Sequence, residues 1–258
     1  MDAKAIGRRL TEAARLPGRA VCVFGSDERM EGSVQSSRID RCLARAVYKL
    51  SIEKETSPLF FGPEAKDGMC PGAQAWCGVS DFSPMIKFFI STGTPEFRRG
   101  EAEYLKPSPE AAERFFRAPG RIVLPFKYLN IAGWDQLQKD QDVLSFVLIG
   151  NAESIRNLGG LIQYSFEDIF YSAIMPGGPS CATMITYAAG LAERAPKNAA
   201  FVGPVDPTGN AWFPPEMMCM ALPFEMAEKM AENIDNSFII KRAHIAFPVK
   251  RLNIEERN

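Results

Sequence analysis

Residues 69–78 read MCPGAQAWCG, a cysteine-opened turn that runs directly into a short helix of small residues. A similar pattern recurs at residues 179–188, PSCATMITYA, where a Gly/Pro turn again leads to a cysteine and an aromatic residue again follows six places later. Self-similarity of this kind indicates an internal duplication. The two cysteines, Cys70 and Cys181, are therefore the first candidates for a functional site.

The duplication predicts how the rest of the chain is organised. It rests on three pairs: Gly25 with Gly150, Cys70 with Cys181, and Glu113 with Glu228. It gives two pseudo-symmetric halves at about 18–130 and 143–250, each ordered strand, helix, turn, strand, strand, helix, strand, after an N-terminal helix at 1–16. We expect a mixed α/β (α+β) fold whose halves share one core within a single domain, residues 1–258.

Hydrophobic periodicity and turn residues place the individual elements. Strands are predicted at 20–25, 86–90, 122–129, 146–150, 199–202, 217–222 and 238–247. Besides the two cysteine-led helices, helices are predicted at 1–16, 36–50, 108–116, 154–164 and 223–230. The polar stretch at 130–142 is predicted to link the two halves.

Composition narrows the classes of function. The 258 residues are 46% apolar and 24% charged, which is typical of a globular protein, and the formal net charge is -1. With a net charge so close to zero, the protein as a whole has no long-range electrostatic attraction for nucleic acid or a membrane, and we expect neither as a partner. No apolar run is long enough to span a membrane and the N-terminus lacks a secretory pattern, so we expect a cytoplasmic protein whose six cysteines stay reduced.

Several short motifs together resemble a known family. They are Arg41-Cys42, Cys70-Pro71-Gly72-Ala73, Leu148 to Glu153, Gly177 to Cys181, and Ala221-Leu222-Pro223. In this order they resemble the uncharacterised archaeal and bacterial family catalogued as domain of unknown function 169, over nearly the whole chain. The resemblance implies a shared fold and a shared pocket. It implies no established reaction.

The residues next to the two cysteines suggest reactive thiols. Pro71 suits the first position of a helix, which puts Cys70 at the N-cap, and Cys181 has the same place before its own helix. A helix N-terminus offers free N–H groups and partial positive charge, which favour thiolate. Facing one another across the two halves, they would form a site for a metal, a cluster or an electrophile. The alternative is that both simply pack in the core.

Two further cysteines extend the candidate site. Cys77 lies two helical turns after Cys70, and Cys42 lies on the apolar face of the helix at 36–50. The spacing does not match a zinc knuckle, but Cys42, Cys70, Cys77 and Cys181 together could ligate an iron–sulfur cluster or a metal. In the duplication Cys42 aligns with Leu158 and Cys77 with Ala188, which favours packing instead. Cys22 and Cys219, in apolar strands, are predicted to be structural.

Candidate binding groups for a cofactor accompany the thiols. Arg41 belongs to a cationic row, Arg38, Arg41, Arg45 and Lys49, that could bind a carboxylate or phosphate group but is also typical of a solvated helix face. With Gly72 and the turn at Gly177 and Gly178, Arg41 is predicted to bind the cofactor. The single histidine, His244, is predicted to be structural.

Three interpretations of function follow. The first is a redox or cofactor-binding protein with a cysteine-lined site between the halves, holding an iron–sulfur cluster or a metal cofactor. The second is an enzyme that uses one activated cysteine on a small anionic substrate. The third is a small-ligand binding module without turnover. All three predict a small-molecule or cofactor ligand and are compatible with a homodimer.

Overall fold

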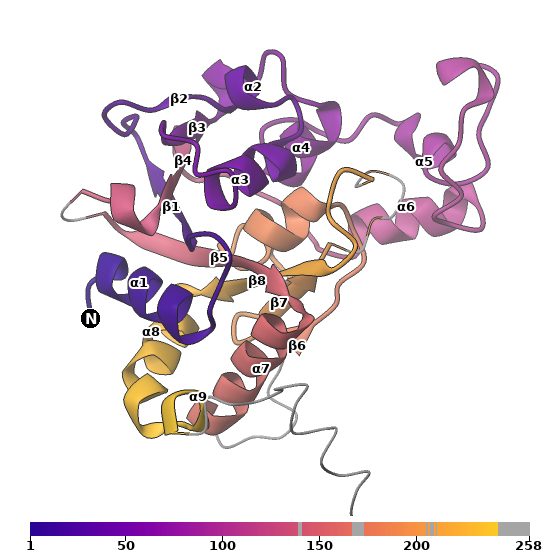
Figure 1. The fold of residues 1–258 in the computed structure, drawn as a ribbon. Coiled ribbons are helices and arrows are strands. Elements are labelled where there is room, and N and C mark those ends of the chain that lie inside the picture. Colours follow the sequence, from indigo (N-terminus) through magenta and orange to yellow (C-terminus); the bar gives the residue numbers. More distant parts are fainter. Residues whose placement is uncertain (139–140, 167–172, 205, 207–208, 210, 242–258) are drawn as a thin grey trace, which may run out of the picture.

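The structure is a computed structural model that describes residues 1–138, 141–166, 173–204, 206, 209 and 211–241. Within them, a single mixed sheet of eight strands lies at the centre and helices cover both of its faces (Figure 1). This confirms the mixed α/β class. The strands are β1 (Val21–Ser26), β2 (Val34–Gln35), β3 (Leu59–Phe61), β4 (Tyr128–Gly133), β5 (Val143–Asn151), β6 (Ala173–Ile174), β7 (Ala200–Gly203) and β8 (Met217–Pro223).

The sheet is built outward from its two central strands. The strand order is β2-β3-β4-β1-β5-β8-β7-β6. β1 pairs with β5 antiparallel, with Val21 opposite Val147. The outermost pairs, β2 with β3 and β6 with β7, are parallel, and all other neighbours are antiparallel. Because β1 and β5 pair directly, the N-terminal and C-terminal strands form one continuous sheet.

Helices on both faces explain why the central strands are continuous apolar runs. Val21 and Val23 of β1 point into one apolar layer, and Cys22 and Phe24 point into the other. The helices are α1 (Ala3–Ala13), α2 (Ser36–Ile39), α3 (Leu43–Ser51), α4 (Pro71–Trp76), α5 (Ile86–Phe89), α6 (Pro109–Arg117), α7 (Ala152–Phe166), α8 (Phe224–Asn233) and α9 (Phe238–Lys241). Shorter helical turns are η1 (Pro63–Ala65), η2 (Arg98–Gly100), η3 (Trp134–Gln136), η4 (Ala182–Thr186) and η5 (Ile234–Asn236).

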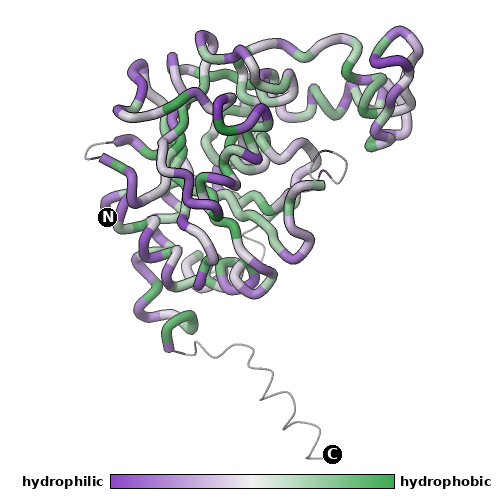
Figure 2. Tube along the Cα trace, turned by 45° about the horizontal axis from the view of Figure 1, so that its top comes forward, coloured by the Kyte–Doolittle hydropathy of each residue, from purple (hydrophilic) through white to green (hydrophobic). Residues whose placement is uncertain are grey.

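The two apolar layers differ in what they hold. α3, α4 and the π-helical turn η4 pack on one face of the sheet, and this layer includes Cys77 and Cys181. α1, α7 and α8 pack on the other face. Many of the apolar segments lie in the interior of the fold, while many of the polar ones lie at its periphery (Figure 2). None of the helices in the described ranges has the length and apolar character needed to cross a membrane.

Most of the predicted elements are confirmed, and two predicted strands are helical where the structure describes them. The strands predicted at 20–25, 146–150, 199–202 and 217–222, and the helices predicted at 1–16, 108–116, 154–164 and 223–230, all have counterparts. Residues 86–89, predicted as a strand, form α5, because a short apolar run does not distinguish strand from helix by periodicity. Residues 238–241 form α9 rather than the start of a closing strand. The rest of that prediction, with His244, lies outside the described residues.

Element boundaries also differ near the centre of the chain. Of the strand predicted at 122–129, only the last two residues belong to β4. The predicted linker at 130–142 begins inside that strand, because its first four residues complete β4. The helix predicted at 36–50 is split into α2 and α3 at Asp40, whose side chain accepts from the backbone N of Cys42 at 3.0 Å. This local hydrogen bond competes with continuation of the helix.

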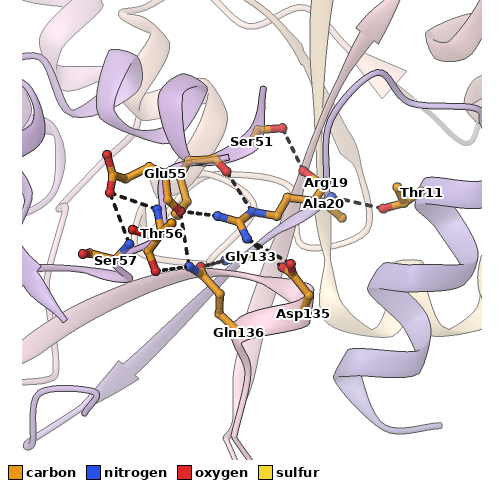
Figure 3. Close-up of polar contacts among 11 residues, drawn as sticks. Thr11, Arg19, Ala20, Ser51, Glu55, Thr56, Ser57, Gly133, Asp135 and Gln136 are labelled. Atoms are coloured by element: carbon orange, nitrogen blue, oxygen red, sulfur yellow. Dashed lines mark hydrogen bonds and ion pairs between the residues drawn. The ribbon is translucent and has the colours of Figure 1, made fainter. Parts of the chain in front are cut away.

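A buried arginine joins three elements at the start of β1 (Figure 3). Arg19, only 9% exposed, donates from Nε to the carbonyl of Leu50 at the end of α3, at 2.9 Å. Its Nη1 contacts both carboxylate oxygens of Asp135 in η3, at 2.9 and 3.0 Å. Its Nη2 donates to the carbonyl of Glu55. The guanidinium therefore satisfies backbone carbonyls left free beyond α3 and ties them to the end of β4.

We expect Arg19→Met to lower the free energy of unfolding by about 2 to 4 kcal/mol. The substitution removes the donor to the Leu50 carbonyl and to the Asp135 carboxylate, and one of the two donors to the Glu55 carbonyl. Asp135→Asn should cost about 1 kcal/mol or less, since the Asp135 side chain is 47% exposed and the bonds to the carbonyls remain. Urea denaturation followed by circular dichroism measures both. Equal losses in the two variants would show that the carbonyl contacts contribute little.

Candidate functional site

The predicted cysteine cap of α4 is present. Cys70 lies at the N-cap, Pro71 takes the first helical position, and the Cys70 Sγ accepts from the backbone N of Ala73 at 3.3 Å. A Cβ added at Gly72 would lie 4.0 Å from this sulfur, so Gly72 flanks the thiol. One N–H of the first helical turn, that of Ala73, is therefore directed at the Cys70 sulfur.

The Arg41-Cys42 motif lies directly beside this cap. The backbone N of Cys70 donates to the carbonyl of Arg41 at 3.0 Å, and Arg41 Nε donates to the carbonyl of Gly68 at 3.2 Å. Cys42 is itself the N-cap of α3. Two helices thus begin next to one another, each at a half-buried cysteine. The Arg41 side chain is exposed, and its hydrogen bond to Gly68 ties it to the loop before α4.

The remaining two thiols lie deeper, where α4 meets η4. Cys181, at the start of η4, is 6% exposed, and Cys77, at the end of α4, is fully buried. The Cys77 Sγ lies 4.0 Å from Thr186 Oγ1, and this hydroxyl donates to the carbonyl of Trp76. α4 and η4 are therefore held together immediately beneath the two half-buried thiols.

Burial controls the acidity of these thiols. It raises the pKa of Cys181 well above its usual value, and the neighbouring Cys77, Cys70 and Cys42 raise it further. It also raises the pKa of Cys77 to about 12. Cys181 therefore lies within electrostatic reach of the other three thiols. The prediction that a helix start favours thiolate at Cys181 is wrong, because loss of solvent outweighs the helix field there.

The Cys42 thiol also has a raised pKa, but it is only half-buried. Burial raises its pKa, the nearby Cys70 adds to the shift, and the backbone N–H groups of Arg45 and Ala44 partly offset it. Its thiol is thus less acidic than a free cysteine, although it keeps access to the surface.

The donor geometry does not form a ready metal site. Within the described part of the chain, no group of three or more His, Cys, Asp or Glu side chains is placed to hold a metal ion. The predicted ligands Cys42, Cys70, Cys77 and Cys181 share a region without converging on one point. Their role as ligands of a metal or cluster stays a prediction.

The chain connections around the two cysteines that the sequence repeat equates are not alike. Cys181 precedes η4, which lies between β6 and β7. Cys42 precedes α3, which lies between β2 and β3, whereas Cys70 follows β3. Cys70 and Cys181 therefore stand in different places relative to the strands around them. The other equated residues differ in the same way, since α6 comes before β4 but α8 comes after β8.

The predicted glycine turn is close to the cluster. Gly178 has φ +134°, and a Cβ there would lie 3.1 Å from the Tyr187 hydroxyl. That hydroxyl donates to the carbonyl of Gly177 at 3.3 Å, and burial, with a smaller effect of Cys181, raises the Tyr187 pKa. Tyr187 also meets Trp76 edge-on, with ring centroids 6.4 Å apart. The two aromatic residues that follow Cys70 and Cys181 at equal spacing are thus in contact.

The cationic row near Arg41 is partly neutralised. Asp40 accepts from Lys49 Nζ at 3.0 Å and pairs with Arg45 Nε at 3.5 Å. Although burial alone would raise the Asp40 pKa, the Cys42 N–H and Lys49 lower it overall. Arg38 and Arg41 are exposed. The row therefore mainly anchors Asp40 at the break between α2 and α3, and its predicted role in ligand binding rests on Arg41.

Sequence reasoning missed a cavity of about 250 Å³ that is lined in part by Tyr187, the residue that follows η4. Its walls include Phe115, Ile174, Gly177, Phe201 and Arg194. Gly177 was selected from the sequence as a binding residue. The others come from distant segments, and a lone arginine in a loop carries no local signal that could have identified it.

Comparison with known proteins gives one result. A model of the family described as uncharacterised ArCR, DUF169, matches residues 9–233. The match covers the whole sheet and every residue of the thiol cluster. Searches of curated proteins and of solved structures find no match.

We expect iodoacetamide to modify Cys70 and Cys42 in the native protein and to spare Cys22, Cys77, Cys181 and Cys219, which are buried. Cys42 should react faster as the pH rises, because its raised pKa limits the thiolate fraction at neutral pH. Peptide mass spectrometry after timed alkylation measures each site. All six should react in denaturant, and rapid native labelling of Cys181 would contradict the burial described here.

Proposed function

The chain belongs to the uncharacterised DUF169 family, and since membership supplies no reaction, we propose from the site itself that it is a thiol redox protein. The proposed redox-active thiols are those of Cys42 and Cys70. The observation that carries this proposal is their position: each is a half-buried N-cap, and the Cys70 N–H donates to the carbonyl directly before Cys42 at 3.0 Å.

The environments of the two thiols suggest different roles. The Cys70 sulfur accepts the Ala73 N–H and lies at the positive end of α4, so it is the attacking group. The Cys42 thiol has a pKa raised by burial and is the resolving group. Cys181 and Cys77, whose pKa values burial raises further, stay protonated beneath them. A disulfide needs a short separation between Cα atoms, which the backbone hydrogen bond between the two segments favours.

The reaction balances with a small-molecule disulfide as oxidant. The Cys70 thiolate attacks one sulfur of that disulfide, so that a new S–S bond forms, the old one breaks and a thiolate leaves. The Cys42 thiolate then attacks the Cys70 sulfur, closes the Cys42–Cys70 bond and releases the second thiolate. The protein loses two electrons and two protons, and the oxidant becomes two thiols.

An iron–sulfur cluster or metal cofactor is the second candidate. The observation in its favour is that Cys181 lies within electrostatic reach of Cys77, Cys70 and Cys42, which are soft sulfur donors. Against it, no group of three such donors in the described ranges is placed to hold a metal ion. The geometry therefore supports the dithiol over the cluster.

We also infer that the chain is an internal duplication, with β1 to β4 equivalent to β5 to β8. Support comes from the strand order, which reads the same from both edges, with a parallel pair at each edge. Cys42 follows Val34, the first residue of β2, at the same sequence separation as Cys181 follows Ala173, the first residue of β6. In this alignment Cys70 belongs to an insertion between β3 and β4, so the dithiol pairs a repeated residue with an inserted one.

Oxidised glutathione tests the dithiol. We expect the wild type to form a Cys42–Cys70 disulfide without retaining glutathione, and Cys42→Ser to stop at glutathione on Cys70. Closure should accelerate as the pH rises, because the Cys42 pKa is raised and its thiolate is scarce at neutral pH. Non-reducing peptide mass spectrometry identifies each species. Cys219→Ser, in a buried strand, is the matched control and should behave as the wild type; retained glutathione on the wild type would refute the pair.

Iron stoichiometry separates the two candidates. After anaerobic purification we expect well under one iron per chain and no visible absorption band. Stoichiometric iron that is lost in both Cys70→Ala and Cys181→Ala, with the fold kept by circular dichroism, would replace the dithiol with the cluster.

A further inference from the structure

The cavity lined by Tyr187 has mainly apolar and aromatic walls. Phe115 at the end of α6, Ile174 of β6 and Phe201 of β7 line it together with Tyr187. The Tyr187 and Phe201 ring centroids are 5.4 Å apart, and Trp76 supports Phe115 from behind at 5.6 Å. These contacts hold the aromatic walls in place, so that an apolar body of matching size would bury surface without rearranging the core.

One charged group lines this apolar cavity. Arg194 is exposed and forms no ion pair within the described part of the chain, and no carboxylate of the described residues lines the cavity. The polar atoms of the opposite wall are already engaged, because the Tyr187 hydroxyl donates to the Gly177 carbonyl. Arg194 is therefore the group available to a ligand, and it selects an anion.

The backbone holds Arg194 at the cavity. Its N–H donates to the carbonyl of Pro119 at 2.9 Å, and the N–H of Glu193 donates to the carbonyl of Arg121 at 2.9 Å. Ile122 and Ala192 form a further antiparallel bridge between the same two segments. The loop is thus fastened to the segment that follows α6, and Pro119 of that segment lines the cavity too.

We propose that this cavity binds a small organic acid with an apolar or aromatic body, whose carboxylate pairs with Arg194. A volume of about 250 Å³ accommodates a single ring with a short acidic chain. The proposal does not depend on the redox function of Cys42 and Cys70, which line no part of the cavity. A ligand there would nevertheless contact Tyr187, which lines the cavity.

The probe is 3-phenylpropanoate, with 3-phenylpropan-1-ol as its neutral counterpart, titrated into the full chain by calorimetry. We expect saturable binding of the acid and about tenfold weaker binding of the alcohol. Arg194→Gln should weaken binding of the acid by a similar factor and leave the affinity for the alcohol unchanged. Arg194→Lys should restore part of the lost affinity for the acid. Fluorescence of Trp76, which contacts two of the walls, should change on binding of the acid.

Lys197→Gln is the matched control, because it removes one exposed positive charge close to Arg194 that does not line the cavity. It should bind the acid as the wild type does. A second variant, Ala195→Phe, fills the cavity and should abolish binding of both probes, with the thermal midpoint measured to verify folding. The proposal is overturned if the acid gives no binding, if the acid and alcohol bind equally, or if Arg194→Gln and Lys197→Gln lose affinity alike.

Discussion

The pairing of β1 with β5 is the constraint on which the rest of this molecule depends. It joins two groups of four strands into one sheet and leaves both central strands buried on each face. The outer parallel pairs require crossovers, and the helices in those crossovers, α3 and η4, lie in the same apolar layer. Cysteines far apart in the sequence meet because the central pairing brings these helix starts to one face.

The fold could be predicted where local pattern and tertiary environment agree. β1, β5, β7 and β8 are apolar runs because helices cover both faces, and such runs are visible in the sequence. The two-residue strands β2 and β6 have no such signal, because the sheet alone defines them. α5 is predicted as a strand because a short, mainly apolar run suits either element.

The candidate site was predictable in its membership and not in its chemistry. Pro71 after Cys70 predicts an N-cap because capping is local, and the structure contains that cap. The pKa of Cys181 depends on burial by other segments, which no spacing reveals. The predicted repeat equates Cys181 with Cys70 because similar residues surround both, although Cys70 follows β3 and Cys181 lies before β7. Arg194 meets its aromatic neighbours only through tertiary contacts.

The shortness of β2 and β6 has a consequence for how copies of this protein could meet. These strands form the two outer edges of the sheet, and each has only two residues. An edge that short offers little unpaired backbone, so a second chain gains almost nothing by extending the sheet. Among the described residues, the helices and loops therefore offer a second copy far more surface than these two edges do.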